Sequence, residues 1–418
     1  MDPAPRRRGL SAGFSIVGVV AALLIAGVTV LALTSSQTRH PHVGATPAAP
    51  VAAADVRAAF IAGLTRVKAG DLAGWQERLP AGGAAAQRVL AELYRHLAPL
   101  HWTALGAGVT AIPGKSDVFD VKITGSIGGV GPDDRVVAER VLVVRRPEDR
   151  LTVVGDQTPA GIRHEYLMAF DKPRMIKAQG GVVVYDSTWR ARAEELAAYL
   201  PQARARLAVL GLHPRQRVLV FCFSSTAQVT DYLAQTLAQG EGKFFSGEAK
   251  RLNGGAAAPA DIGVVAPALA ERQAWAPLML SHELTHAFTM PWFDKTAHAP
   301  PMLEEGLAVA VEGGRSYSAL RRELASGNKS MPLLQAFATG DLWMNGSSAR
   351  IQLAYLESGA VVGYILQHWG PAPLKRFVLQ VADSSLSPQA IKEIVRRLLG
   401  ESWTKFYGGL VQYVYTLP

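Results

Sequence analysis

The chain has 418 residues, of which 18% are charged and 49% hydrophobic, and it carries a formal net charge of +9 at pH 7. This apolar content excludes a disordered chain, and the length favours two folded domains with additional segments. The basic residues are scattered rather than gathered in a stripe with aromatic side chains, so we expect no nucleic-acid partner. The single cysteine, Cys222, lies in an apolar run, which excludes an internal disulfide or a cysteine-rich metal site and predicts a buried side chain.

The N-terminal segment predicts a membrane anchor. Residues 1–13 contain three consecutive arginines, and residues 14–33 form an uncharged apolar run about as long as a helix that crosses a bilayer. The basic flank should stay in the cytoplasm, which places the rest of the chain outside it as a single-pass membrane protein. Because the run is long and no Ala-x-Ala site closes it, we expect an uncleaved anchor, with a cleaved signal peptide as the alternative. Residues 34–55, rich in Ala, Pro, Ser and Thr, predict a flexible linker.

Residues 56–160 predict a small α+β domain. Apolar residues recur every three or four positions over 56–67, and a second helix is expected over 86–97. Segments typical of strands follow, separated by turn residues, at 118–123, 136–144 and 151–154. This order of helices and then antiparallel strands resembles the nuclear-transport-factor-2-like (NTF2-like) domains. A spacer, a substrate-docking module and a partner-binding module remain open as roles.

Residues 166–418 predict a second domain with a mixed sheet and a mainly helical C-terminal part, so the fold class as a whole is α+β. A helix is expected over 190–210, in which Pro201 can introduce a kink. The segment 240–260, rich in Gly, Lys, Arg and Ala, predicts a mobile loop. Strands are expected at 181–185, 216–223 and 262–266.

A His-Glu-x-x-His motif lies in the segment 280–288. Two histidines four residues apart project from the same face of a helix, and zinc favours imidazole ligands; His282 and His286 have this spacing. Glu283 would lie beside a bound metal without ligating it, where it can take a proton from water, so it is the candidate general base. A chance match to the motif is the alternative, and a third ligand is needed to decide.

The segment 301–308, Pro-Met-Leu-Glu-Glu-Gly-Leu-Ala, follows another proline, as is typical of a helix start. Here the chain resembles the gluzincin metallopeptidases, and in particular the peptidase-MA-like bacterial proteins, whose second helix carries a Leu-x-Glu-Gly-x-Ala pattern. The resemblance implies that Glu305, which precedes the glycine, is the third zinc ligand, with residues 287–304 between it and His286. Glu304 is the alternative, but on a helix it points about 100° away from Glu305.

The resemblance covers about the last 250 residues, and its motifs are confined to these two helices. The chain lacks the Gly-x-Met-Glu-Asn stretch of aminopeptidases, so we expect an endopeptidase. The aspartate that thermolysin-like enzymes carry four residues after the ligand is Val309 here. Glu312, two turns beyond Glu305 on the same helix face, is a candidate for orienting a ligating histidine. A charged residue at the helix end before Gly313 is the alternative.

A helix expected over 349–369 offers a donor for the oxyanion that develops during peptide hydrolysis. It contains Tyr355, Tyr364 and His368. Its Tyr-Leu-Glu-Ser segment resembles the Tyr-x-x-Ser stretch of peptidase-MA-like proteins, which favours Tyr355, and aromatic packing between helices is the alternative. His298, between the two motif helices, is a further candidate for approaching the substrate, with an ordinary solvated loop residue as the alternative.

These patterns together predict a membrane-anchored, extracytoplasmic zinc metallopeptidase that acts on peptides or proteins. One Zn²⁺ per chain would be held by His282, His286 and Glu305. A catalytically inactive cell-envelope binding module that keeps the zinc site is the alternative. An intramembrane protease is excluded, because the apolar stretch 275–290 is too short to span a bilayer. The sequence predicts neither the oligomeric state nor the substrate preference.

Overall fold

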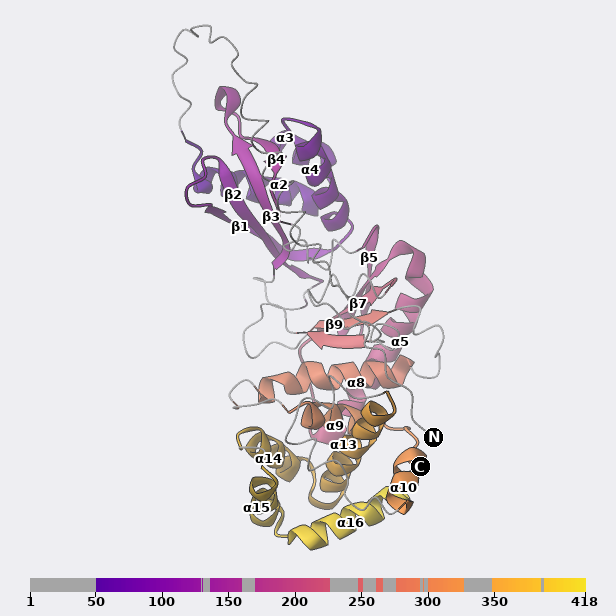
Figure 1. Ribbon diagram of the computed structural model, residues 1–418. Helices are drawn as coiled ribbons and strands as arrows, with labels where there is room; N and C mark the ends of the chain where they lie inside the picture. The colour runs from indigo at the N-terminus through magenta and orange to yellow at the C-terminus, as the bar shows by residue number, and fades with distance from the viewer. Residues whose placement is uncertain are drawn as a thin grey trace, which may run out of the picture. The chain divides into compact units, whose positions relative to one another are not determined.

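The structure is a computed structural model (Figure 1), and it describes the following residues: 50–128, 130, 136–159, 170–225, 247–250, 261–265, 276–293, 296, 300–326, 348–384 and 387–418. The predicted cytoplasmic tail and membrane segment, and most of the predicted linker, lie outside these residues. Among the helices that the structure describes, none is both long and apolar enough to cross a bilayer.

The N-terminal part of the described chain is a three-helix layer on a four-stranded antiparallel sheet (Figure 1). Phe60 and Leu64 from the helices share a hydrophobic cluster with Phe119 and Val121 from the sheet. The helices are α2 (Ala53–Lys68), α3 (Leu72–Arg78) and α4 (Ala84–Leu97), and the strands are β1 (Trp102–Ala111), β2 (Val118–Ile127), β3 (Val136–Arg145) and β4 (Thr152–Asp156).

The two helices and three strands predicted for this part are therefore present, as part of an α+β fold. The sequence did not predict β1 or α3. β1 contains glycine and alanine at several positions, which have low strand propensity, and it forms because it pairs along its length with β2.

A second, mixed sheet follows, with strand order β5-β6-β7-β9-β8. β6, β7 and β9 run parallel, while β5 and β8 pair antiparallel at the two edges. The helix α5 (Arg190–Arg206) connects β6 to β7 and continues through Pro201, which lies inside it. The strands are β5 (Pro173–Ala178), β6 (Gly181–Asp186), β7 (Val218–Phe223), β8 (Gly247–Lys250) and β9 (Asp261–Val265).

The sequence predicted the mixed sheet but not its two edge strands. The segment 240–260 was expected to be a loop throughout, and this is wrong for Gly247–Lys250, which pairs with β9. The sequence also did not predict β5. Both strands lie at the edges of the sheet, where pairing with a neighbour rather than local composition makes a strand.

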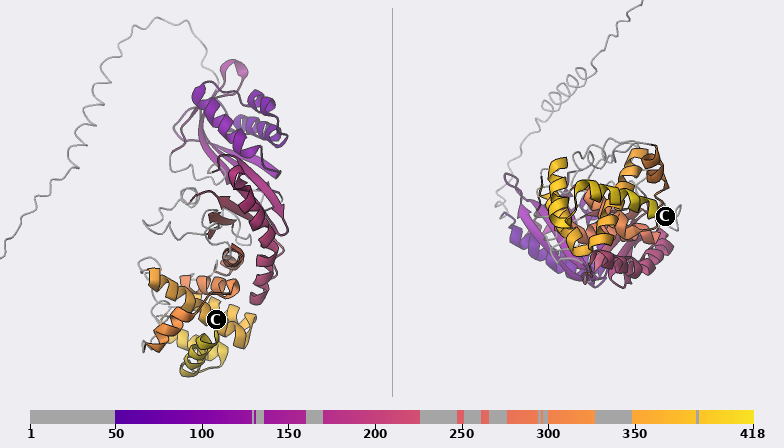
Figure 2. Two further views of the ribbon diagram at one scale, coloured as in Figure 1. Left: turned by 90° about the vertical axis from the view of Figure 1, so that its right-hand side faces the viewer. Right: turned by 90° about the horizontal axis from the view of Figure 1, so that it is seen from below.

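Among the residues that the structure describes after 275, most are helical, as predicted. The right-hand view of Figure 2 shows these helices from below. Proline occupies the first turn of α9, where the missing N–H needs no partner. The helices are α8 (Ala276–Thr289), α9 (Pro301–Glu312), α10 (Ser318–Ala325), α13 (Ser348–Trp369), α14 (Pro371–Ala382), α15 (Pro388–Leu399) and α16 (Trp403–Thr416).

The strands β6 and β7 of the second sheet are buried on both faces, and they support α8. Every residue of β6 and β7 is buried. Alternate residues such as Val220 and Cys222 pack in one hydrophobic cluster with Leu280 and Leu284 of α8. Cys222 is fully buried, as its apolar surroundings predicted. The helix that carries the His-Glu-x-x-His motif is thus fixed against the core of the domain.

This helical part contains a buried acid whose carboxylate makes no hydrogen bond within the described residues. Glu357 on α13 is 1% exposed, and neither of its carboxylate oxygens has a hydrogen-bond partner among the described residues. Burial, together with the negative charge of Glu323, raises the pKa of Glu357 to about 8. The carboxyl group is therefore mainly protonated at neutral pH.

The stability of the protein should consequently depend on pH through Glu357. In the unfolded chain this carboxyl ionises near its ordinary pKa of 4.5, so the folded state binds more protons between pH 4.5 and about 8. The free energy of unfolding therefore falls as pH rises through that window, by up to about 1.4 kcal/mol per pH unit. The variant Glu357→Gln lacks this term, so its stability relative to the wild type should rise by about 3 kcal/mol from pH 5 to pH 7.5.

Thermal or denaturant melting at the two pH values measures this difference. Glu393→Gln, which alters an exposed acid on α15, is the control and should show no comparable change. A stability difference between Glu357→Gln and the wild type that stays constant from pH 5 to pH 7.5 contradicts the prediction.

Candidate metal centre

The helix α8 carries an unusual number of buried polar residues, and the hydroxyl groups among them are satisfied locally. Ser281, Thr285 and Thr289 are at most 1% exposed. Each donates to the main-chain carbonyl four residues earlier, at 2.8 Å. The side chains of His282 and His286 instead extend to partners on other elements and to each other. The motif residues are therefore the part of α8 that faces a site.

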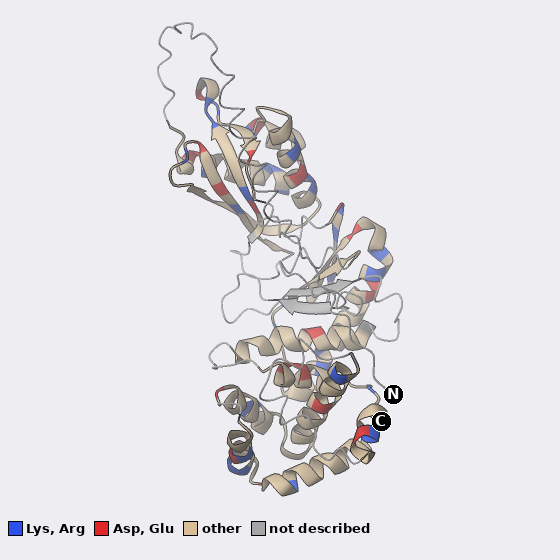
Figure 3. Ribbon diagram, in the orientation of Figure 1, with Lys and Arg blue, Asp and Glu red and all other residues tan. Residues whose placement is uncertain are grey.

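Three side chains converge between α8 and α9, which pack against each other and both carry acidic residues (Figure 3). Nε2 of His282 lies 3.1 Å from Oε2 of Glu305 and 3.2 Å from Nε2 of His286. The remaining pair, Nε2 of His286 and Oε2 of Glu305, is 3.5 Å apart. Ligand atoms placed tetrahedrally at about 2.0–2.1 Å from a zinc ion lie about 3.3 Å from one another. The three atoms are thus spaced as the ligands of one metal ion.

The hydrogen bonding of His282 also fits a cation at this point. Its Nδ1 lies 3.1 Å from Oε2 of Glu312, which is fully buried. A carboxylate accepts, so Nδ1 donates. In the protonated ring Nε2 also donates, to Glu305, and in the neutral ring its lone pair points at the same carboxylate, so that a metal ion can replace the proton between the two atoms.

The acid–base properties of the site follow from the same contacts. Burial lowers the pKa of His282, but hydrogen bonds to Glu305 and Glu312 outweigh it and raise the pKa to about 10. Burial likewise raises the pKa of Glu305, but the charge of His286 and hydrogen bonds from both histidines hold that pKa below its ordinary value. Without metal the site therefore keeps a proton at neutral pH, which metal binding must displace.

The structure brings Glu305, and not Glu304, into the group of residues that can hold a metal ion. The neighbouring Gly306 explains how α9 carries this carboxylate close to α13. A Cβ atom at position 306 would lie 2.7 Å from the main-chain oxygen of Ser358 and 2.8 Å from the side chain of Val362, so only glycine allows this approach. Glu312 is the last residue of α9, two turns after Glu305. Its carboxylate contacts Nδ1 of His282, as predicted for a residue that orients this ring.

Of the other residues that the sequence suggested for the site, one lies at the candidate metal ligands and two lie elsewhere. The ring of Tyr355 lies 6.2 Å from the ring of His282, and a hydrogen bond joins its hydroxyl to Glu305. Tyr364 and His368 instead lie in an aromatic cluster with residues of α16, where packing accounts for them. His298 lies outside the described residues. Tyr355 is therefore the candidate that the structure places at the centre.

The sequence patterns missed Arg315. Its Nε and Nη2 donate to Oε2 of Glu312 at 2.9 and 2.6 Å, and its guanidinium carbon lies 5.2 Å from the centre of the Tyr355 ring. The only signal in the sequence was an arginine three residues after Glu312, which by itself is a common surface spacing.

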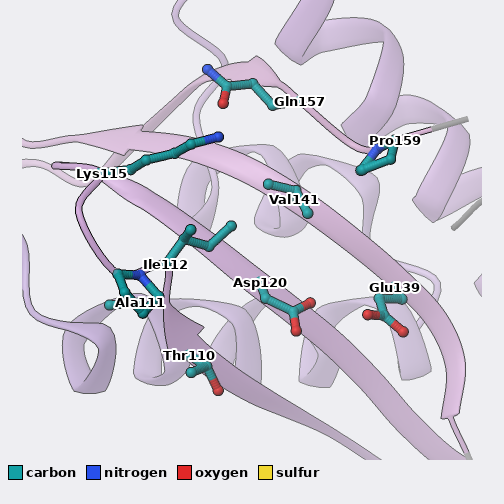
Figure 4. A pocket seen from close by; sticks show the side chains of 10 residues that line it. Thr110, Ala111, Ile112, Lys115, Asp120, Glu139, Val141, Gln157 and Pro159 are labelled. Atoms are coloured by element: carbon teal, nitrogen blue, oxygen red, sulfur yellow. The ribbon is translucent and has the colours of Figure 1, made fainter.

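A separate cavity of ≈ 380 Å³ lies on the helix-free face of the first sheet (Figure 4). Lys122 is 3.7 Å from Asp120 and 3.3 Å from Glu139, so the acidic groups in its wall are paired with a neighbouring cation. The cavity contains no grouping of ligands like that of His282, His286 and Glu305.

Comparisons with protein-family models, curated proteins and solved structures find no match for this chain. The resemblances to gluzincin metallopeptidases and to NTF2-like domains therefore stay predictions.

The centre can be tested with two adjacent acids. Glu305→Ala removes one of the three candidate zinc ligands, so zinc affinity should fall by more than the roughly 10- to 100-fold that a residue hydrogen-bonded to a ligand contributes. Glu304→Ala leaves the three candidate ligands in place and should keep one zinc per chain. Metal analysis after dialysis, with a competing chelator for the affinity, measures both. Zinc retained by Glu305→Ala but lost from Glu304→Ala contradicts the assignment.

Proposed function

We propose that this chain is a zinc metallopeptidase that hydrolyses peptide bonds with Glu283 as the general base. The observation that supports the proposal is the mutual spacing of the donor atoms of His282, His286 and Glu305. Two histidines and one carboxylate form a ligand set typical of catalytic zinc, which keeps a position open for water. A zinc ion bound there would lower the pKa of a coordinated water and polarise the substrate carbonyl.

Glu283 has the properties that the proton-transfer role requires. It follows His282 directly on α8 and is 6% exposed. It is not a member of the candidate ligand group His282, His286 and Glu305. Burial raises the pKa of Glu283, and together with the negative charges of Glu305 and Glu312 it outweighs the lowering by His282 and His286. A carboxylate with a raised pKa is a better proton acceptor near neutral pH. We therefore assign to Glu283 the removal of a proton from the attacking water and its delivery to the leaving amine.

Tyr355 is the proposed donor to the oxyanion. Burial, with the negative charges of Glu305 and Glu283, raises the pKa of Tyr355, so its hydroxyl keeps its proton at every physiological pH. A protonated hydroxyl next to the ligands can donate a hydrogen bond to the oxygen on which negative charge develops.

The sequence of the N-terminal segment supports a proposed activity outside the cytoplasm. The apolar run 14–33, with its arginine-rich flank, supports a single membrane anchor with the catalytic part on the outer side. The absence from the sequence of a Gly-x-Met-Glu-Asn stretch supports an endopeptidase acting on peptides or proteins. The first sheet and its helices would then hold the catalytic part away from the anchor or dock its partners.

Glu283→Gln tests the general base. The amide cannot take a proton, so the rate of peptide hydrolysis should fall about 10²- to 10⁴-fold while one zinc per chain remains bound. Glu304→Gln, which changes a nearby acid outside the ligand group, should hydrolyse peptides at nearly the wild-type rate. Cleavage of a peptide library, followed by mass spectrometry, measures both. Wild-type rates in Glu283→Gln contradict the proposal.

The same experiment separates an enzyme from a binding module that keeps the zinc site. If the wild type holds one zinc per chain and cleaves no member of the library, the enzyme proposal is wrong and the binding module is favoured.

Tyr355→Phe tests the oxyanion donor. Removing a single donor of this kind typically costs about 10²- to 10³-fold in kcat, and KM should change little because the hydrogen bond forms mainly in the transition state. Tyr364→Phe, nine residues further along α13 in the aromatic cluster, is the matched control. Equal kcat values for Tyr355→Phe and Tyr364→Phe contradict the role.

A further inference from the structure

Arg315 contacts two residues that each lie next to His282. It donates through Nε and Nη2 to Oε2 of Glu312, and that same oxygen accepts the Nδ1–H of His282. Its guanidinium carbon also lies 5.2 Å from the centre of the Tyr355 ring, within the range of a cation–π contact. One cation thus links the carboxylate that hydrogen-bonds His282 to the tyrosine whose ring lies near it.

The backbone after α9 is built to bring Arg315 into this place. Gly313 and Gly314 have φ values of 65° and 72°, a conformation that glycine adopts without strain. The chain therefore turns sharply at the end of the helix, and Arg315 comes back against Glu312 three residues earlier. A Cβ atom at position 313 would meet no other group within 4 Å, so the backbone conformation, rather than space, accounts for glycine at that position.

The contact with Arg315 keeps Glu312 usable as an acceptor. Glu312 is 0% exposed, and a buried carboxylate without a counter-charge is strongly disfavoured. The two hydrogen bonds from Arg315 supply that counter-charge at Oε2, the oxygen that also accepts from Nδ1 of His282. When Nδ1 donates to this oxygen, Nε2 is the ring nitrogen left to bind a metal.

The contact with Tyr355 is the second link that Arg315 makes to the centre. The tyrosine ring lies 6.2 Å from the ring of His282, and its hydroxyl is hydrogen-bonded to Glu305. The ring is therefore held from one face by the guanidinium and at its hydroxyl by a ligand residue. A guanidinium suits this double contact because it is planar, permanently charged and able both to hydrogen-bond a carboxylate and to lie over a ring.

We propose that Arg315 is a positioning residue that sets two parts of the centre at once, the tautomer and orientation of His282 through Glu312 and the place of Tyr355 through its ring. The effect on metal affinity follows from the metal centre alone. The effect on turnover rests on the proposed function.

Zinc affinity of the full-length protein, measured by competition with a chelator, tests the first part. Arg315→Met should raise the Kd for zinc about 10- to 100-fold, because removal of an outer partner of a ligating histidine has an effect of this size. Arg315→Lys should recover part of the loss, since it restores the charge but not the paired hydrogen bonds. In the double variant with Glu312→Gln, the Kd should be no higher than for Glu312→Gln alone, because both substitutions break the same link.

Arg206→Met is the matched control. Arg206 also contacts Glu312, but at its main-chain carbonyl rather than at the carboxylate, so the Kd for zinc should stay within about twofold of the wild type. For the second part, Arg315→Met loaded with saturating zinc should retain a lowered kcat, as expected if Tyr355 is displaced.

The outcomes separate this inference from the proposed function. A wild type that binds zinc, with a Kd for Arg315→Met within twofold of it, overturns the positioning role whether or not peptides are cleaved. Additive effects of Arg315→Met and Glu312→Gln overturn it as well. A wild type that binds zinc and shows these affinity changes, but cleaves no peptide, contradicts the proposed function and leaves the effect on His282 established. A wild type that does not bind zinc overturns both.

Discussion

The centre depends on one constraint, which is that Nε2 of His282 and Oε2 of Glu305 face each other at 3.1 Å. Either a proton on Nε2 or a metal ion bound by both atoms satisfies this contact, and the surrounding structure holds the two atoms there. The buried strands β6 and β7 support α8, glycine at position 306 lets α9 approach α13, and Glu312 holds the ring of His282 at Nδ1. Packing energy from the apolar core thus offsets the cost of burying this group of charges.

The sequence predicted those parts of the fold that are encoded locally. Apolar periodicity identified helices such as α2, α4 and α13, and continuous apolar runs identified β6 and β7, which are buried on both faces. It missed β1, β5 and β8, because these strands owe their structure to a neighbouring strand that a local pattern does not contain. The predicted membrane segment lies outside the described residues and stays a prediction.

In the site, too, the sequence predicted residues that share a helix and missed those that only tertiary packing brings together. The spacing of His282 and His286 is a property of one helix, and Glu305 came from a pattern on the next. Glu312 could be suggested because it shares a helix face with Glu305. Arg315 could not, because its role arises only after two glycines turn the chain back and α13 brings Tyr355 beside it. Tyr355 was one of three candidates on its helix, and only tertiary packing separates it from Tyr364 and His368.

X-ray absorption spectroscopy at the zinc edge, on purified protein containing its metal, identifies the ligands of the proposed zinc site. We expect one zinc per chain with two imidazole nitrogens and oxygen ligands at about 2.0–2.1 Å, and no sulfur, since the only cysteine is fully buried in the core. The same spectrum from His282→Ala should show one imidazole fewer or no bound zinc. A protein purified without metal that does not take up zinc, or a spectrum with a sulfur ligand near 2.3 Å, would rule out this zinc site.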